Sequence, residues 1–113
     1  MAEFDEVRYQ VNRCLCYQYP GDANDEDGSI DRTWINKKQK YEVDYAIAKC
    51  LCDCYAEALV KNTKFIQRLE AEIQNMNHDG IGRCEHRKAY SALYEIIQRR
   101  QRLKKILCSW LSN

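Results

Sequence analysis

Three cysteines at alternate positions are the residues of this chain with the clearest chemical potential. They are Cys50, Cys52 and Cys54, in the stretch 48-AKCLCDCYAE-57, and the whole chain has seven cysteines and two histidines. Cysteine thiolates bind zinc, whereas free cysteine is a small and commonly buried apolar residue. Which role applies depends on the secondary structure that carries the triplet.

Helical geometry argues against a site in which all three cysteines bind one metal ion. Each residue of an α-helix is rotated by about 100° from the one before it, so Cys50 and Cys54 share one side while Cys52 points elsewhere. A zinc set compatible with helices would be Cys50, Cys54, Cys108 and Cys14. Structural zinc sites usually take ligands from turns with CxxC spacing, which the sequence lacks. We therefore expect the cysteines to pack as apolar residues without a cofactor, and a zinc-stabilised helical domain is a secondary alternative.

Other metal-binding and catalytic patterns are incomplete. Residues 25–31 have the acidic groups and the glycine of the middle of an EF-hand calcium loop, but the first and twelfth ligand positions fall on Ala23 and Trp34. Only His78 and His86 offer imidazole bases, and the sequence contains no glycine-rich phosphate loop, HExxH or GxSxG motif. We therefore expect a protein that is not an enzyme.

The spacing of apolar residues predicts an all-α fold. Glycine occurs four times and proline once, which disfavours a turn-rich β protein. The sequence predicts, in order, a helix over about 3–17, an acidic loop over 19–33, a long helix over about 34–76, a turn over 77–82 and a helix over about 83–111. We expect the last two helices to form a long antiparallel hairpin with the N-terminal helix against it, a three-helix bundle-like single domain spanning 1–113. The long helix has one weak point, at residues 61–63, where it could kink or divide.

The periodicity also predicts what the helices bury. In the last helix, Leu93, Ile96, Leu103, Leu107 and Trp110 recur at helical spacing and are expected to point inward. In the long helix, Tyr41 and Tyr45 begin a second apolar stripe that the N-terminal helix is expected to cover. If that helix packs elsewhere, the two tyrosines become candidate residues of a dimer or partner surface, because tyrosine is favoured at interfaces.

Charge is unevenly distributed along the chain. Residues 1–33 contain three basic and eight acidic residues, whereas residues 83–113 contain eight basic and two acidic ones. Within the run 98-QRRQRLKK-105, the candidate binding residues are Arg99, Arg100, Arg102, Lys104 and Lys105. Arg100 is expected to face Ala58 in the hairpin seam, where it either extends to pair with Glu57 or forms a polar notch.

These observations favour a small non-enzymatic binding or regulatory protein that acts by contact with another protein, as an inhibitor or accessory factor of phage or viral type. The alternative is a nucleic-acid-binding protein that uses the basic helix 83–111. No apolar segment reaches the roughly 20 residues that span a bilayer, so no membrane association is expected. An odd number of cysteines without a secretory leader indicates a cytoplasmic protein with reduced thiols. A homodimer is compatible with the sequence.

Overall fold

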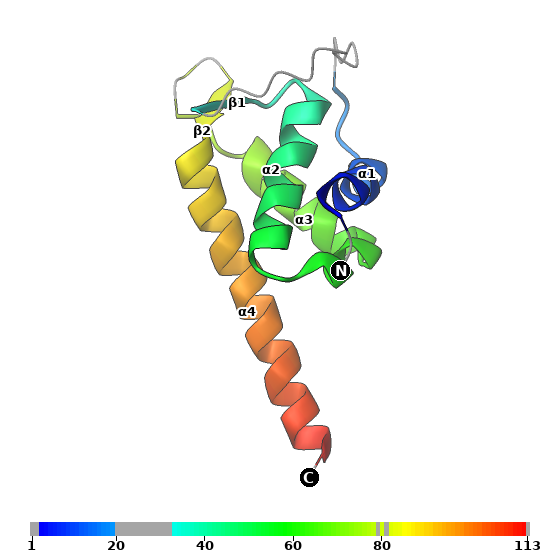
Figure 1. Ribbon diagram of the computed structural model, residues 1–113. Helices are drawn as coiled ribbons and strands as arrows, with labels where there is room; N and C mark the ends of the chain where they lie inside the picture. The colour runs from blue at the N-terminus through cyan, green and yellow to red at the C-terminus, as the bar shows by residue number, and fades with distance from the viewer. Residues whose placement is uncertain (1–2, 20–32, 79, 81, 113) are drawn as a thin grey trace.

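The computed structural model describes residues 3–19, 33–78, 80 and 82–112 (Figure 1). Along these residues lie α1 (Phe4–Cys14), β1 (Trp34–Asn36), α2 (Lys40–Asp53), the 3₁₀ helix η1 (Glu57–Lys61), α3 (Thr63–Gln74), β2 (Arg83–Glu85) and α4 (His86–Ser112). The mainly helical character expected from the sequence is confirmed. The acidic loop predicted over 19–33, with its EF-hand-like segment, lies outside the described residues except at its two ends.

The prediction of a single helix over 34–76 is wrong, because the chain reverses direction after α2. Tyr55 has φ 54°, in the left-handed region. Its N–H donates to the carbonyl of Cys52 at 3.1 Å, and the N–H of Ala56 donates to that of Leu51 at 2.8 Å. This pair of bonds is a Schellman motif, which ends a helix and usually places glycine where Tyr55 stands.

A second break follows at the weak point expected from the sequence. The side-chain oxygen of Asn62 accepts the N–H of Phe65 at 3.1 Å and so caps the start of α3. Two helices and a 3₁₀ turn therefore replace the expected long helix.

The reversal changes how α4 is partnered. The thiol of Cys50 contacts the carbonyl of Tyr90, and Gln101 donates to the carbonyl of Cys54, so residue numbers rise together along α2 and α4. These two helices therefore run parallel, and α3 is the antiparallel neighbour of α4 (Figure 1). The antiparallel hairpin, which would have placed Cys108 near Cys50 and Cys54, is therefore wrong: Gln101 lies beside Cys54, and Cys108 follows seven residues later, about 10 Å further along the helix.

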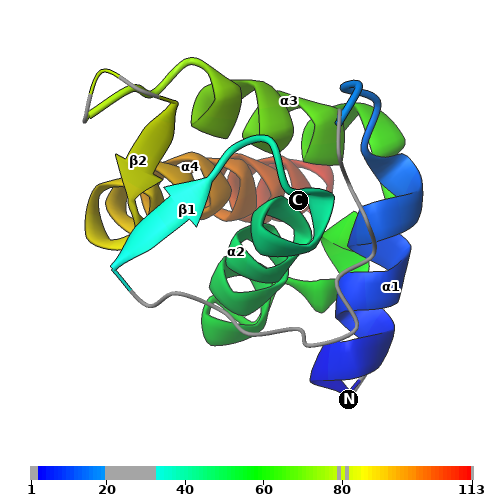
Figure 2. The ribbon, with the colours of Figure 1, turned by 90° about the horizontal axis from the view of Figure 1, so that it is seen from above.

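The core fills the space between the four α-helices of the described chain, as seen from above in Figure 2. A short ribbon of β1 and β2, which the sequence did not predict, closes one end, with Ile35 opposite Cys84 and both side chains fully buried. The largest fully buried apolar side chains are Ile35, Ile47, Leu51, Ile66, Leu69, Ile73, Leu93, Ile97, Val7, Val11 and Val43.

Polar bonds fix α1 against α2. Asp44 is buried, and its carboxylate accepts Arg8 Nε at 2.6 Å and Asn12 Nδ2 at 2.8 Å. Burial raises the pKa of Asp44, and the bonds from Arg8 and Asn12 offset part of that rise. The Arg8 guanidinium also lies over the ring of Tyr45, and the ring of Phe4 meets the same ring edge-on. The N-terminal helix thus covers part of the tyrosine stripe.

A second buried carboxylate holds the segment after α1. Glu70 of α3 is fully buried and accepts the backbone N–H of Cys16 at 2.9 Å and that of Tyr17 at 3.2 Å. The hydroxyl of Tyr19 donates to the same carboxylate. Burial and this carboxylate raise the pKa of Tyr19, so its hydroxyl remains a donor. Glu70 therefore anchors a stretch of chain that has no helix or strand bonds of its own.

We predict that Glu70→Ala lowers the free energy of unfolding by about 2–4 kcal/mol, because three donors lose their acceptor. Glu72→Ala, on the same helix, should change it by less than about 0.5 kcal/mol. Urea denaturation measures both. Equal effects of the two substitutions would show that Glu70 is not an anchor.

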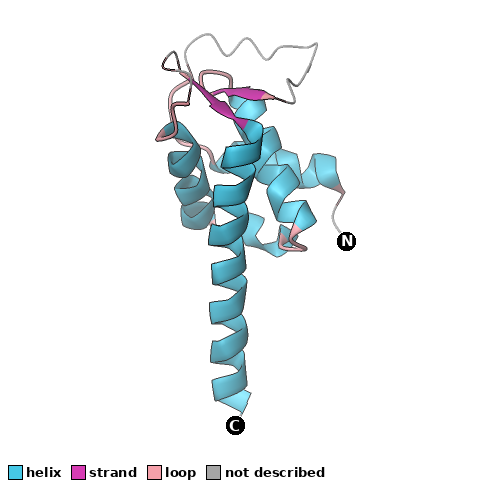
Figure 3. Ribbon diagram, turned by 90° about the vertical axis from the view of Figure 1, so that its left-hand side faces the viewer, coloured by secondary structure: helices cyan, strands magenta, loops and turns pink. Residues whose placement is uncertain are grey.

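The C-terminal part of α4 extends beyond the rest of the protein. Figures 1 and 3 show its lower half running away from the other helices, and residues 102–107 and Trp110 are all exposed. We call residues 102–112 the stem. No helix in the described part of the chain is long and apolar enough to cross a lipid bilayer.

Candidate functional site

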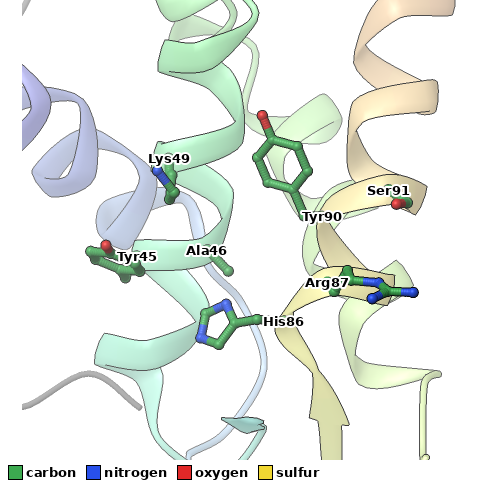
Figure 4. Close-up of a pocket in the computed structure, with 7 residues that line it drawn as sticks. All are labelled: Tyr45, Ala46, Lys49, His86, Arg87, Tyr90 and Ser91. Carbon is green, nitrogen blue, oxygen red and sulfur yellow. The ribbon is translucent and has the colours of Figure 1, made fainter. Parts of the chain in front are cut away.

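Two grooves flank α4, one near its start and one where the stem begins. The upper cleft has a volume of about 500 Å³ and lies between α2 and the first turns of α4 (Figure 4). It is lined by Tyr45, Ala46, Lys49, His86, Arg87, Tyr90 and Ser91. The cleft thus combines aromatic rings with positive groups.

Two polar groups of the upper cleft, those of Lys49 and Tyr90, share one protein partner. Lys49 Nζ lies 3.7 Å from Asp53, and the hydroxyl of Tyr90 donates to the same carboxylate at 2.9 Å. Burial and Asp53 raise the pKa of Tyr90, which keeps this hydroxyl protonated. The ring of His86 meets that of Tyr45 edge-on at 6.3 Å. Asp53 therefore offsets the charge of Lys49, whereas Arg87 is an exposed cation that lines the same cleft.

The lower groove, of about 430 Å³, lies between the turn after α2 and α4. It is lined by Tyr55, Ala56, Ala58, Leu59, Arg100, Gln101, Lys104 and Lys105. Gln101 fastens its two walls by donating to the carbonyl of Cys54 at 3.0 Å. The groove carries three cations and is continuous with the stem, since Lys104 and Lys105 belong to both.

Arg100 stands at the base of the stem. Its guanidinium carbon lies 5.7 Å from the centre of the Phe65 ring, a cation–π contact with a residue of α3. The side chain is exposed, so it covers the edge of the core and still faces the groove. Ala58, which Arg100 was expected to face, lines the same groove, and the contact with Phe65 was not expected.

The structure separates the remaining predicted binding residues. Arg99 pairs with Glu95 one turn earlier at 2.8 Å, and Arg102 is exposed on the stem. Tyr45 lines the upper cleft, and Tyr41 is half-buried beside α1, its backbone carbonyl bonded by Arg8. The basic residues thus gather at the stem, and the two tyrosines lie elsewhere.

Four large apolar side chains on the stem are exposed, contrary to the inward orientation predicted for three of them. The exposed fractions are 59% for Leu103, 53% for Ile106, 60% for Leu107 and 79% for Trp110. In the expected antiparallel hairpin, these side chains packed against the first half of the long helix. In the structure α2 runs parallel to α4 and ends at Asp53, near the start of the stem, so this partner is missing among the described residues. Helical periodicity identified the apolar side of α4, but it carries no information about where the neighbouring helix ends.

Most of the described cysteines are buried, and the thiols of Cys50 and Cys54 interact with each other, whereas Cys14 has different neighbours. The Cys14 thiol contacts the carbonyl of Val60, whereas that of Cys50 contacts the carbonyl of Tyr90. Among the described residues, no group of three or more His, Cys, Asp or Glu side chains could hold a metal ion. The side chain of Cys108, the fourth member of the expected zinc set, lies outside the described part of the chain.

Burial raises the pKa of Cys50 and of Cys54, so both are neutral thiols at physiological pH. A neutral thiol is a poor nucleophile and a poor metal ligand. The environment of Cys50 and Cys54 therefore suits apolar packing better than catalysis or metal binding.

Comparisons of this chain with protein-family models, with curated proteins and with solved structures found no match.

We predict that Tyr55→Gly raises the free energy of unfolding by about 1 kcal/mol. Glycine removes the cost of a left-handed backbone, and Tyr55 is 80% exposed, so little packing is lost. Tyr55→Ala keeps the backbone cost and should remain within about 0.5 kcal/mol of the parent. Thermal and urea denaturation would contradict this if alanine stabilised the protein as much as glycine.

We predict that stability falls in alkaline solution because of Cys50. Its pKa in the folded protein is raised above the ordinary 9.0, so above that pH the folded state retains a proton that the unfolded chain loses. Below about pH 9, Cys50 does not reduce the free energy of unfolding. Above that pH, its contribution lowers the free energy of unfolding by up to about 1.4 kcal/mol per pH unit. Cys50→Ala should reduce the slope in reducing buffer. An identical slope in parent and variant would exclude this contribution.

Proposed function

We propose that this protein is a small non-enzymatic binding protein that acts by protein–protein contact through the stem of α4. The observation that carries the proposal is the exposed stripe formed by Leu103, Ile106, Leu107 and Trp110. Their spacing, i, i+3, i+4 and i+7, is that of the anchor residues of a helix that binds in a groove of another protein. A regulatory or inhibitory effect would then arise from covering a surface on that protein.

The amount of apolar surface supports a binding role. Burying what remains exposed of these four side chains contributes roughly 1–2 kcal/mol each, or roughly 4–8 kcal/mol in all. Association itself costs about 4–15 kcal/mol in lost translational and rotational freedom. The stripe can therefore provide a large part of a binding free energy, and the residues around it must provide the remainder.

Nucleic-acid binding through α4 is the second candidate, favoured by the exposed cations Arg102, Lys104 and Lys105. Contacts to phosphates would leave the apolar stripe in water, and Arg99 is already paired with Glu95. We therefore expect only weak, non-specific duplex binding, with a log–log salt slope that grows by about 0.9 for each phosphate contacted.

To test the proposal, a photo-crosslinking amino acid is placed at Leu107 and, as a control, at Arg68 on the exposed face of α3. We predict a crosslinked protein in the native cell from position 107 only, unaffected by nuclease. The purified partner should bind the parent protein at least ten-fold more tightly than the Leu107→Asp variant. Leu107 is exposed, so this variant should keep the parent's melting temperature.

Two results would contradict the proposal. One is tight binding of a mixed-sequence duplex at physiological salt that is lost in the Arg99/Arg102/Lys105→Ala variant. The other is equal crosslinking from positions 107 and 68.

A further inference from the structure

We infer that the partner surface is an apolar groove with an acidic rim on another protein, into which the stem inserts as a helix. The inference rests on the proposed function and adds the chemistry of the partner. It follows from the width of the apolar stripe and from the positive charges beside it. These charges disfavour a groove with basic rims and a second copy of this chain.

The stripe is narrow and has a cation on each side. With a rotation of about 100° per residue, Leu103, Ile106, Leu107 and Trp110 fall within an arc of about 100°. By the same geometry, Arg102 flanks this arc on one side and Lys104 on the other. Both are exposed. A groove that buries the arc brings its two rims beside these cations.

The charges favour acidic rims. Apolar burial by the stripe is comparable with the cost of association, so complementary charge at the rims would contribute to affinity. None of the residues 100–107 is acidic, and Arg100, Lys104 and Lys105 extend the positive surface into the lower groove. Basic rims would face like charges along both flanks of the stem.

The same charges disfavour a second copy of this chain as the occupant. Two parallel stems packed along the stripe would bring the flank that carries Arg102 in one copy beside the flank that carries Lys104 in the other, because opposite edges of the two helices meet in such pairs. Two antiparallel stems would bring Lys104 beside Lys104. Either arrangement places cations together at the edge of an apolar seam, where like charges are destabilising.

The test uses the full chain and a designed helical hairpin with a leucine-lined groove and glutamate rims. An otherwise identical hairpin has lysine rims. In a Trp34→Phe background, Trp110, which is 79% exposed, reports its burial by a blue shift of its fluorescence. We expect the glutamate-rimmed hairpin to bind at least ten-fold more tightly than the lysine-rimmed one at physiological salt.

Matched charge variants locate the effect. Arg102→Glu/Lys104→Glu should reverse the preference for the two hairpins. Lys64→Glu/Arg68→Glu makes the same charge change on the exposed surface of α3 and should leave the preference unchanged. If both pairs of substitutions acted alike, the discrimination would be a net-charge effect, and the inference would be wrong.

Three other outcomes would also overturn the inference: equal affinity for the two hairpins, binding of neither hairpin while sedimentation shows self-association, or a preference for anionic lipid vesicles or duplex over both hairpins. Position-107 crosslinking distinguishes this failure from that of the proposed function. A protein crosslinked there, without a preference for acidic rims, would leave protein binding in place and reject only the partner's chemistry.

Discussion

The left-handed turn at Tyr55 is the constraint on which the architecture depends. Its bonds to Cys52 and, through Ala56, to Leu51 end α2 and allow the chain to reverse within a few residues. Because of that reversal, α3 returns antiparallel to α4 instead of extending α2. The wall of neighbouring helices therefore ends near Gln101, and the stem continues alone. The exposed apolar stripe is a consequence of a backbone conformation in a different element.

The body that carries the stem is held by apolar packing and by two buried carboxylates with different roles. Asp44 joins two helices and has a cation, Arg8, beside it. Glu70 joins a helix to an irregular segment through two backbone N–H groups and Tyr19. The irregular segment has few other ways to satisfy its backbone donors, so an acceptor with two oxygens suits it. Both carboxylates bond to α1 or to the segment that follows it, and neither contacts the stem.

The sequence predicted those features that depend on local periodicity, and it failed where non-local geometry decides. The helix expected over about 3–17 agrees closely with α1, and the weak point at 61–63 coincides with the cap at Asn62. Tyr55 gave no such signal, because glycine is the usual residue at this position of a Schellman motif. The strands of the ribbon are three residues each and lie far apart in the sequence, too short for an alternating pattern. The basic run of the stem was visible in the sequence, whereas its proximity to Tyr55 required the fold.

The core and the proposed binding surface are two parts of one periodic pattern. Leu93 and Ile97 are fully buried under α2 and α3, whereas Leu103 and Leu107, about two to three turns beyond Ile97, are exposed. The residue types do not mark the boundary between the buried and the exposed part of this apolar stripe. The length of the neighbouring helices sets that boundary. A partner with an apolar groove would cover the stem much as α2 and α3 cover the first half of α4. The cations between 99 and 105 begin close to this boundary, so the proposed binding surface starts where the intramolecular packing of α4 ends.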